Sequence, residues 1–125
     1  MSGCEDQLDA AIRAVQTVAA AQLHDRRPAH EDFYAWGYAL GELTYRLAGA
    51  CRTLEQQQAV YGVRRILSDD EGGDPYQRLA RMRRLLRELS DQLDSTSAIA
   101  QRYHAEAAHL GVEVDPDAPA GPVTG

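Results

Sequence analysis

Histidine and carboxylate side chains are the first candidates for chemistry in this sequence, because together they bind metal ions in helical bundles. Glu106 and His109 have the Glu-x-x-His spacing that places both side chains on one side of a helix. His24 and His30 flank the connection between the first two predicted helices, which an up-down-up chain brings to the same end. Glu106 and His109 fall outside the apolar stripe of their helix, whereas metal ligands project into a bundle core. The pattern therefore favours solvated side chains, and we expect no bound metal and no cofactor.

Arginines gather in the middle of the chain, where residues 63–87 hold seven of them against four acidic residues. Guanidinium groups bind phosphates bidentately, so the cluster is a candidate polyanion site. The candidate contacts are Arg64, Arg65, Arg78, Arg81 and Arg84. These side chains surround their helices instead of following one stripe, and the turn between them is acidic. A solvated surface is therefore the competing interpretation.

The composition argues against several classes of function. All 13 basic residues are arginine, and the net charge of −6 is unlike that of a general nucleic-acid binder. The two cysteines form no spaced motif, and Cys51 is interpreted as a buried structural thiol. The start of the chain lacks the basic stretch of a signal peptide, and the longest uncharged apolar run is about half a membrane span. We expect a cytoplasmic protein with no membrane association.

The elements that carry these residues are predicted to be helices. A helix over about 75–110 begins with Asp74 as N-cap and Pro75 at its first position. Its apolar stripe repeats every three or four residues: Leu79, Met82, Leu86, Leu89, Leu93, Thr96, Ala100, Tyr103, Ala107 and Leu110. Such an unbroken heptad pattern is typical of a helix packed along a neighbour.

A second helix over about 30–67 has a matching stripe, and a short polar turn separates the two. The stripe is Phe33, Trp36, Leu40, Leu43, Leu47, Ala50, Leu54, Gln57 and Tyr61. Helices of nearly equal length with matching stripes predict an antiparallel, coiled-coil-like hairpin. Residues 112–125 have no periodicity and are predicted to be a disordered tail after a single domain over 1–111.

A shorter helix over about 5–23 completes an all-α, three-helix fold. We expect it to pack on the first half of the second helix and the last half of the third, where Gly37 and Gly41 of the second helix would allow close approach to its alanines. The expected contact stripe is Tyr34, Tyr38, Gly41, Tyr45 and Ala48. This helix is too short to cover the half of the hairpin near the turn. The surface predicted to associate there is Leu79, Met82, Leu85, Leu86 and Leu89.

The chain resembles, in its all-arginine, alanine-rich texture, small uncharacterised α-helical proteins of actinobacterial plasmids, phages and integrative elements. That resemblance implies no activity and no functional residues. A WXG100-type secreted hairpin is the other comparison, and it is disfavoured. Trp36 and Gly37 are adjacent and lie inside a predicted helix, whereas in that family Trp-x-Gly lies in the turn.

These observations predict a non-enzymatic protein–protein interaction, assembly or regulatory module that acts through helical surfaces. An enzyme is less expected, because no pair of titratable groups can be placed in one cleft. A homodimer or a second helical protein is the expected partner, because part of the hairpin lacks a covering helix. The alternative is a nucleic-acid-associated accessory protein that uses the arginines near the hairpin turn.

Overall fold

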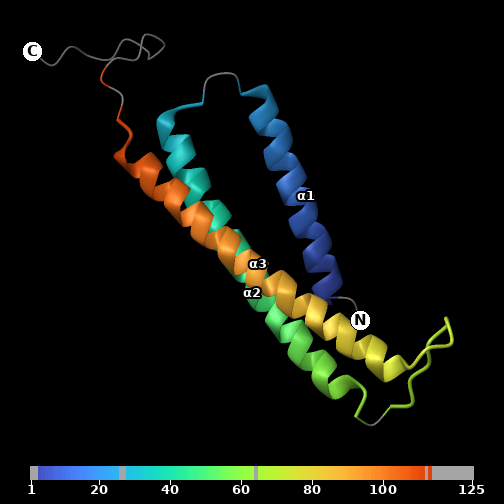
Figure 1. Cartoon of the computed structure of the whole chain (residues 1–125). Helices are drawn as coiled ribbons and strands as arrows, with labels where there is room; N and C mark the ends of the chain where they lie inside the picture. The colour runs from blue at the N-terminus through green and yellow to red at the C-terminus, as the bar shows by residue number, and fades with distance from the viewer. Residues whose placement is uncertain (1–2, 26–27, 64, 112, 114–125) are drawn as a thin grey trace, which may run out of the picture.

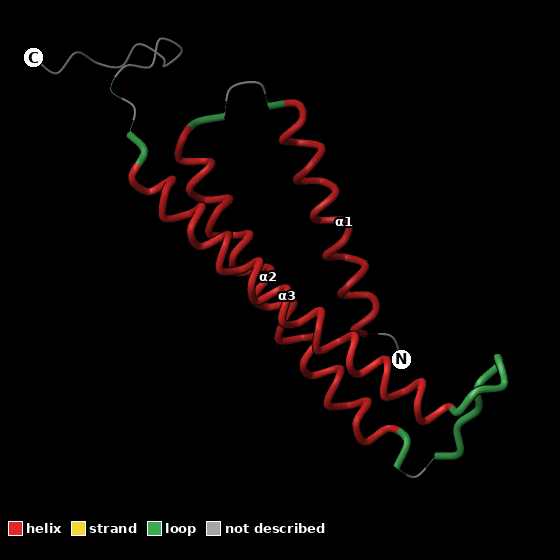
Figure 2. Tube along the Cα trace, viewed as in Figure 1, coloured by secondary structure: helices red, strands yellow, loops and turns green. Residues whose placement is uncertain are grey.

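The computed structural model confirms an all-α protein with three helices. It describes residues 3–25, 28–63, 65–111 and 113. The helices are α1 (Gly3–His24), α2 (His30–Tyr61) and α3 (Pro75–His109), and no strand occurs among these residues (Figure 2). Helices α2 and α3 lie side by side as a long antiparallel hairpin (Figure 1). Apart from Glu113, the predicted tail lies outside the described residues.

Helix α3 begins and ends almost where its sequence predicts. Asp74 adopts an extended backbone as N-cap, and its Oδ1 accepts a hydrogen bond of 2.9 Å from the backbone N–H of Tyr76. Pro75 occupies the first turn, where its missing N–H costs nothing. The helix ends at His109, and the N–H of Leu110 donates to the carbonyl of Ala107.

Helix α2 ends at Tyr61, six residues before the predicted boundary at Leu67. A side chain at Gly62 would lie 3.3 Å from Leu79 and 3.4 Å from Leu67, so the chain folds back tightly against α3 at this glycine. The hydroxyl of Tyr76 donates to the Arg65 carbonyl over 2.9 Å and holds the returning segment. The helix prediction was wrong here because these contacts outweigh the helical pattern of residues 63–67.

The most deeply buried positions between α2 and α3 are small or polar residues, which corrects part of the predicted stripes. The buried residues of α2 are Gly37, Gly41 and Ala48, and those of α3 are Ser90 and Ser97. The Ser97 hydroxyl donates to the Gly41 carbonyl over 3.0 Å. Small side chains let the two backbones come close enough for such bonds.

Gly37 and Gly41 do allow a close approach, but their neighbour is α3 and not α1 as expected. A Cβ on Gly37 would lie 2.9 Å from Cα of His104. The ring of Tyr34 stacks on His104 with centroids 4.0 Å apart, and Nδ1 of His104 lies 2.9 Å from the Tyr34 carbonyl oxygen. The stripe that we assigned to the N-terminal helix therefore belongs largely to the hairpin interface.

Helix α1 is shorter than the hairpin and runs from its open end to a point beside the N-terminal half of α3 (Figure 1). It was expected to pack on the first half of α2; it shares a groove with that half of α2 and with Tyr103 of α3, but it makes no close contact with either helix and none of its residues is buried. Among the described residues, Ala48 is the only apolar side chain that is fully buried. No described helix combines the length and apolar character needed to cross a membrane.

Candidate functional site

The structure does not gather the histidine and carboxylate candidates into a metal site. His24 ends α1, and Nδ1 of His30 pairs with Oε1 of Glu31 at 3.5 Å. Glu106 and His109 are exposed near the end of α3. Among the described residues, no three histidine, cysteine, aspartate or glutamate side chains form a metal-binding group.

Several arginines near the hairpin turn are engaged within the chain. Arg78 donates from Nε to Oδ2 of Asp69 over 3.0 Å and from a terminal nitrogen to Oε2 of Glu71 over 3.1 Å. The Asp69 side chain is only 1% exposed. Its pKa is held below the usual value by a hydrogen bond from the Glu71 backbone N–H and by Arg78, whose own pKa is raised by the same pair. Arg65 lies over the ring of Tyr61, 4.3 Å from its centroid.

A second group of charges joins the two long helices. Arg83 and Arg87 of α3 both pair with Oε1 of Glu55 on α2, at 3.1 and 3.3 Å, and the Glu55 side chain is 14% exposed. Within the described part of the chain, Arg81 and Arg84 are exposed and make no ion pair. Arg64 lies outside that part. Of the four predicted polyanion contacts that the structure describes, Arg81 and Arg84 are therefore the two that are exposed without an ion pair.

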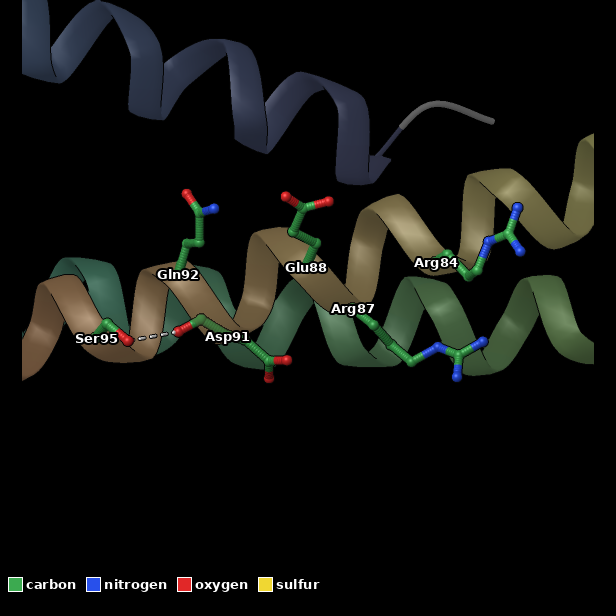
Figure 3. Close-up of a pocket in the computed structure, with 6 residues that line it drawn as sticks. All are labelled: Arg84, Arg87, Glu88, Asp91, Gln92 and Ser95. Carbon is green, nitrogen blue, oxygen red and sulfur yellow. Dashed lines mark hydrogen bonds between the residues drawn. The ribbon is translucent and has the colours of Figure 1, made fainter.

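A shallow hollow of about 370 Å³ lies on the outer side of α3. Figure 3 shows the residues that line it: Arg84, Arg87, Glu88, Asp91, Gln92 and Ser95. Ser95 donates its hydroxyl to the Asp91 backbone carbonyl over 3.1 Å and is thus used locally. Basic residues precede acidic ones along this surface, and the arrangement offers charge complementarity to another surface, without a nucleophile placed beside a base.

An apolar groove of about 390 Å³ separates α1 from the hairpin. The residues that line it are Ala14, Val15, Val18, Ala19 and Gln22 of α1, Trp36, Ala39, Leu40 and Leu43 of α2, and Tyr103 of α3. The groove therefore brings residues of α2 and α3 to one side of the hairpin. Its lining is almost entirely hydrocarbon, which favours an apolar surface as its ligand.

The same side of the hairpin stays apolar toward the turn. In an antiparallel pair, residues seven apart on each helix repeat the same orientation, so the stripes through Leu40 and Tyr103 continue along the hairpin. We call this surface the apolar face: Leu40, Leu43, Leu47, Leu54 and Tyr61 of α2, and Met82, Leu85, Leu89, Ile99 and Tyr103 of α3. Each of these side chains is exposed. The opposite side, which we call the polar side, carries Arg52 paired with Asp94 together with the exposed tyrosines Tyr38 and Tyr45.

Only part of the predicted association surface is exposed. Met82, Leu85 and Leu89 are exposed on the apolar face, whereas Leu79 and Leu86 are half-buried against α2. The leucines of α2 were missed as surface residues because their heptad spacing was interpreted as the hairpin seam. A large side chain left in water forgoes about 1.5–3 kcal/mol of burial, so this face is costly for the isolated chain.

Cys4 is exposed and Cys51 is half-buried in α2, and both are free thiols. Cys51 was expected to be buried; it is half-buried, at the heptad position that Thr44 and Gln58 also occupy beside α3. Comparisons of the chain with protein-family models, with curated proteins and with solved structures give no match.

Proposed function

We propose that this protein is a non-enzymatic interaction module whose apolar face binds another helical protein surface. One observation carries the proposal: ten large side chains are exposed along one side of the hairpin, while the buried apolar core of the described residues is Ala48. Patches of this kind mark protein–protein contacts in soluble proteins. The expected setting is the cytoplasm, where free thiols stay reduced.

The partner surface should itself be helical and apolar. The exposed leucines of α2 recur every seven residues, at Leu40, Leu47 and Leu54, which suits the ridges of a second helix. The charged groups of the hairpin lie on its other side or at the rim, where they limit which partners fit. An assembly, adaptor or regulatory role needs only such a surface.

Site-specific photocrosslinking in the native host tests this proposal. A benzophenone amino acid at Leu47 should give covalent adducts with protein, whether another copy or a different chain. The matched control is the same substitution at Tyr45, which is more exposed but lies one heptad before Arg52 on the polar side. Equal labelling at both positions, or no protein adduct at Leu47, contradicts the proposal.

The alternative function is that of a nucleic-acid-associated accessory protein, and Arg81 and Arg84 are the residues that support it. Both are exposed near the turn and make no ion pair among the described residues. Two guanidinium groups give a shallow dependence of affinity on salt, because the slope follows the number of phosphates neutralised. The interaction module is therefore the better-supported function.

A further inference from the structure

We infer that α1 is a reversible cover, which closes onto part of the apolar face and must move away before a partner binds there. This inference rests on the proposed function, because it concerns how access to the same face is regulated. The part that α1 covers is the half farthest from the turn, and we call it the open-end half: Leu40, Leu43 and Leu47 of α2, with Ile99 and Tyr103 of α3.

Helix α1 stands away from the hairpin in this structure. Over its full length, Gly3–His24, no Cα atom lies within 8 Å of a Cα atom of α2 or α3. Helices that pack directly have axes only about 8–10 Å apart, which brings some Cα atoms closer than that. The apolar groove of about 390 Å³ occupies the gap. The structure therefore shows α1 poised over the hairpin and not packed on it.

The large apolar side chains of α1 face the groove. They recur every three or four residues and form one stripe: Leu8, Ile12, Val15 and Val18. All four are about half exposed, and the last two line the groove. A helix gains most of its stability by packing such a stripe on a neighbour. The hairpin wall of the groove, with Trp36 and Leu40, is the apolar surface that lies opposite.

The two surfaces match in level as well as in chemistry. Helix α1 runs antiparallel to α2, so its earlier residues face later residues of α2 (Figure 1). Val15 lines the groove together with Leu40 and Leu43. One turn earlier on α1, Ile12 reaches the level of Leu47, which lies one turn later on α2. The stripe of α1 thus has an apolar counterpart along the open-end half.

The N-terminal end of α1 lies over α3. Figure 3 shows Glu88 and Gln92 of α3 extending toward this end. Both side chains are polar, so the apolar contact that forms on closure ends near Leu8. Closure therefore controls access to the open-end half of the apolar face in particular.

The contact that closes the groove is weak enough for a partner to replace. The groove-lining residues of α1 are two alanines, two valines and a glutamine: Ala14, Val15, Val18, Ala19 and Gln22. Burial stabilises in proportion to the apolar area removed from water, and these small side chains each bury little. A partner helix with leucines at the same spacing buries more area against Leu40 and Leu43. Such a partner displaces α1, whereas a less apolar surface does not.

A disulfide between α1 and α2 tests closure directly, because bonded cysteines have Cα atoms about 4.4–6.8 Å apart and the open arrangement exceeds 8 Å. Ala14→Cys/Ala39→Cys places one thiol on each wall of the groove, in a chain with Cys4→Ser and Cys51→Ser. Oxidation with diamide should join the two thiols within one chain. Ala14→Cys/Tyr38→Cys is the matched control, since Tyr38 is next to Ala39 but lies on the polar side. This control should react roughly tenfold more slowly.

A second pair removes the dependence on one level of the helices. Val18→Cys/Ala39→Cys moves the thiol of α1 by about one turn, and its control is Val18→Cys/Tyr38→Cys. At least one groove pair should form its disulfide faster than its control. If neither does, α1 does not close on the hairpin and the inference is wrong.

Trp36, the single tryptophan of the chain, reports closure without added thiols. It lines the groove and is half-buried. Val15→Glu places a carboxylate against the hydrocarbon wall and keeps α1 open, so quenching of Trp36 by acrylamide should rise roughly twofold. Gln16→Glu creates the same carboxylate beside Val15 but outside the groove lining, and it should leave the quenching unchanged. Equal quenching of the wild type and both variants contradicts closure.

Locking α1 in place tests its role as a cover. The benzophenone amino acid at Leu47 is combined with Ala14→Cys/Ala39→Cys in the same serine background, and the purified chain is irradiated in host extract, oxidised or reduced. The oxidised chain should give roughly tenfold fewer adducts with other proteins, because the closed α1 covers Leu47. The same chain without the cysteine pair controls for the effect of the reductant. Equal adduct yields in the two states overturn the inference.

The proposed function and this inference fail in different ways. If the Leu47 photocrosslinker labels a partner equally in the locked and reduced chains, the interaction module stands and the cover is wrong. If Leu47 labels no protein in either state although the groove cysteines form their disulfide, the proposed function is wrong while the closure of α1 holds.

Discussion

Replacing Gly37 with alanine measures how closely α2 and α3 approach each other. The added Cβ would lie 2.8 Å from Cδ1 of Tyr103 and 2.9 Å from Cα of His104. The Tyr103 ring can rotate away, but the His104 Cα belongs to the backbone, so the helices themselves must separate. Overpacking of this kind costs about 1–3 kcal/mol. Alanine returns about 1 kcal/mol of helix propensity, and we expect a net loss of about 1 kcal/mol.

Two other helical glycines provide matched controls. A Cβ on Gly49 meets nothing within 4 Å, and one on Gly41 meets Cβ of Ala100 at 3.8 Å, an ordinary contact. Alanine at either position should therefore stabilise the protein by about 1 kcal/mol. Gly37→Ala and Gly49→Ala should differ by about 2 kcal/mol, although both make the same chemical change in one helix.

Urea unfolding followed by circular dichroism at the helix band measures these differences. All variants must be compared at one total protein concentration, because self-association adds to the apparent stability. If Gly37→Ala is as stable as Gly49→Ala, the close contact of Gly37 with His104 is not present in solution. The helix-propensity gain alone would then explain both variants.

Three further predictions concern the interface, the turn and the arginines. In chemical denaturation, Ser97→Ala should lower the free energy of unfolding by about 1 kcal/mol, because the Gly41 carbonyl loses the buried Ser97 hydroxyl as donor. Ser95→Ala is the control, because the Ser95 hydroxyl is exposed and donates only within α3. Because the pKa of Asp69 is lowered in the folded protein, its contribution to the free energy of unfolding is complete above its unfolded pKa of about 3.8. That contribution is lost as the pH falls through the folded pKa. Asp69→Asn should therefore lower the melting temperature at neutral pH and converge with the wild type in strong acid, and a gap independent of pH would contradict this linkage. Arg81→Ala/Arg84→Ala should leave a gel-shift titration with a generic DNA duplex unchanged at low salt, whereas clear wild-type binding that this variant abolishes would support the nucleic-acid alternative.

The sequence by itself determined the helices and their connections. Asp74 and Pro75 placed the start of α3, and the unbroken heptad spacing predicted a long partner helix. The polar, glycine-containing segment after α2 predicted an antiparallel hairpin, and the short first helix left part of that hairpin uncovered. The end of α2 was less predictable, since the chain at Gly62 packs against Leu79, which belongs to α3, as well as against the nearby Leu67.

Only the tertiary structure decided which stripe of each helix faces the other. Periodicity gives the spacing of a stripe but not its orientation, and the leucine stripes lie one step around each helix from the stripes of Gly37, Gly41, Ser90 and Ser97. Hydrophobicity favoured the leucines as the seam. Small side chains occupy the centre of the interface instead, because they let the backbones approach closely enough for the Ser97 hydroxyl to reach the Gly41 carbonyl. The leucines of α2, with Leu85 and Leu89 of α3, are therefore left on the outside, where they form the candidate interaction surface, while Leu79 and Leu86 stay half-buried against α2.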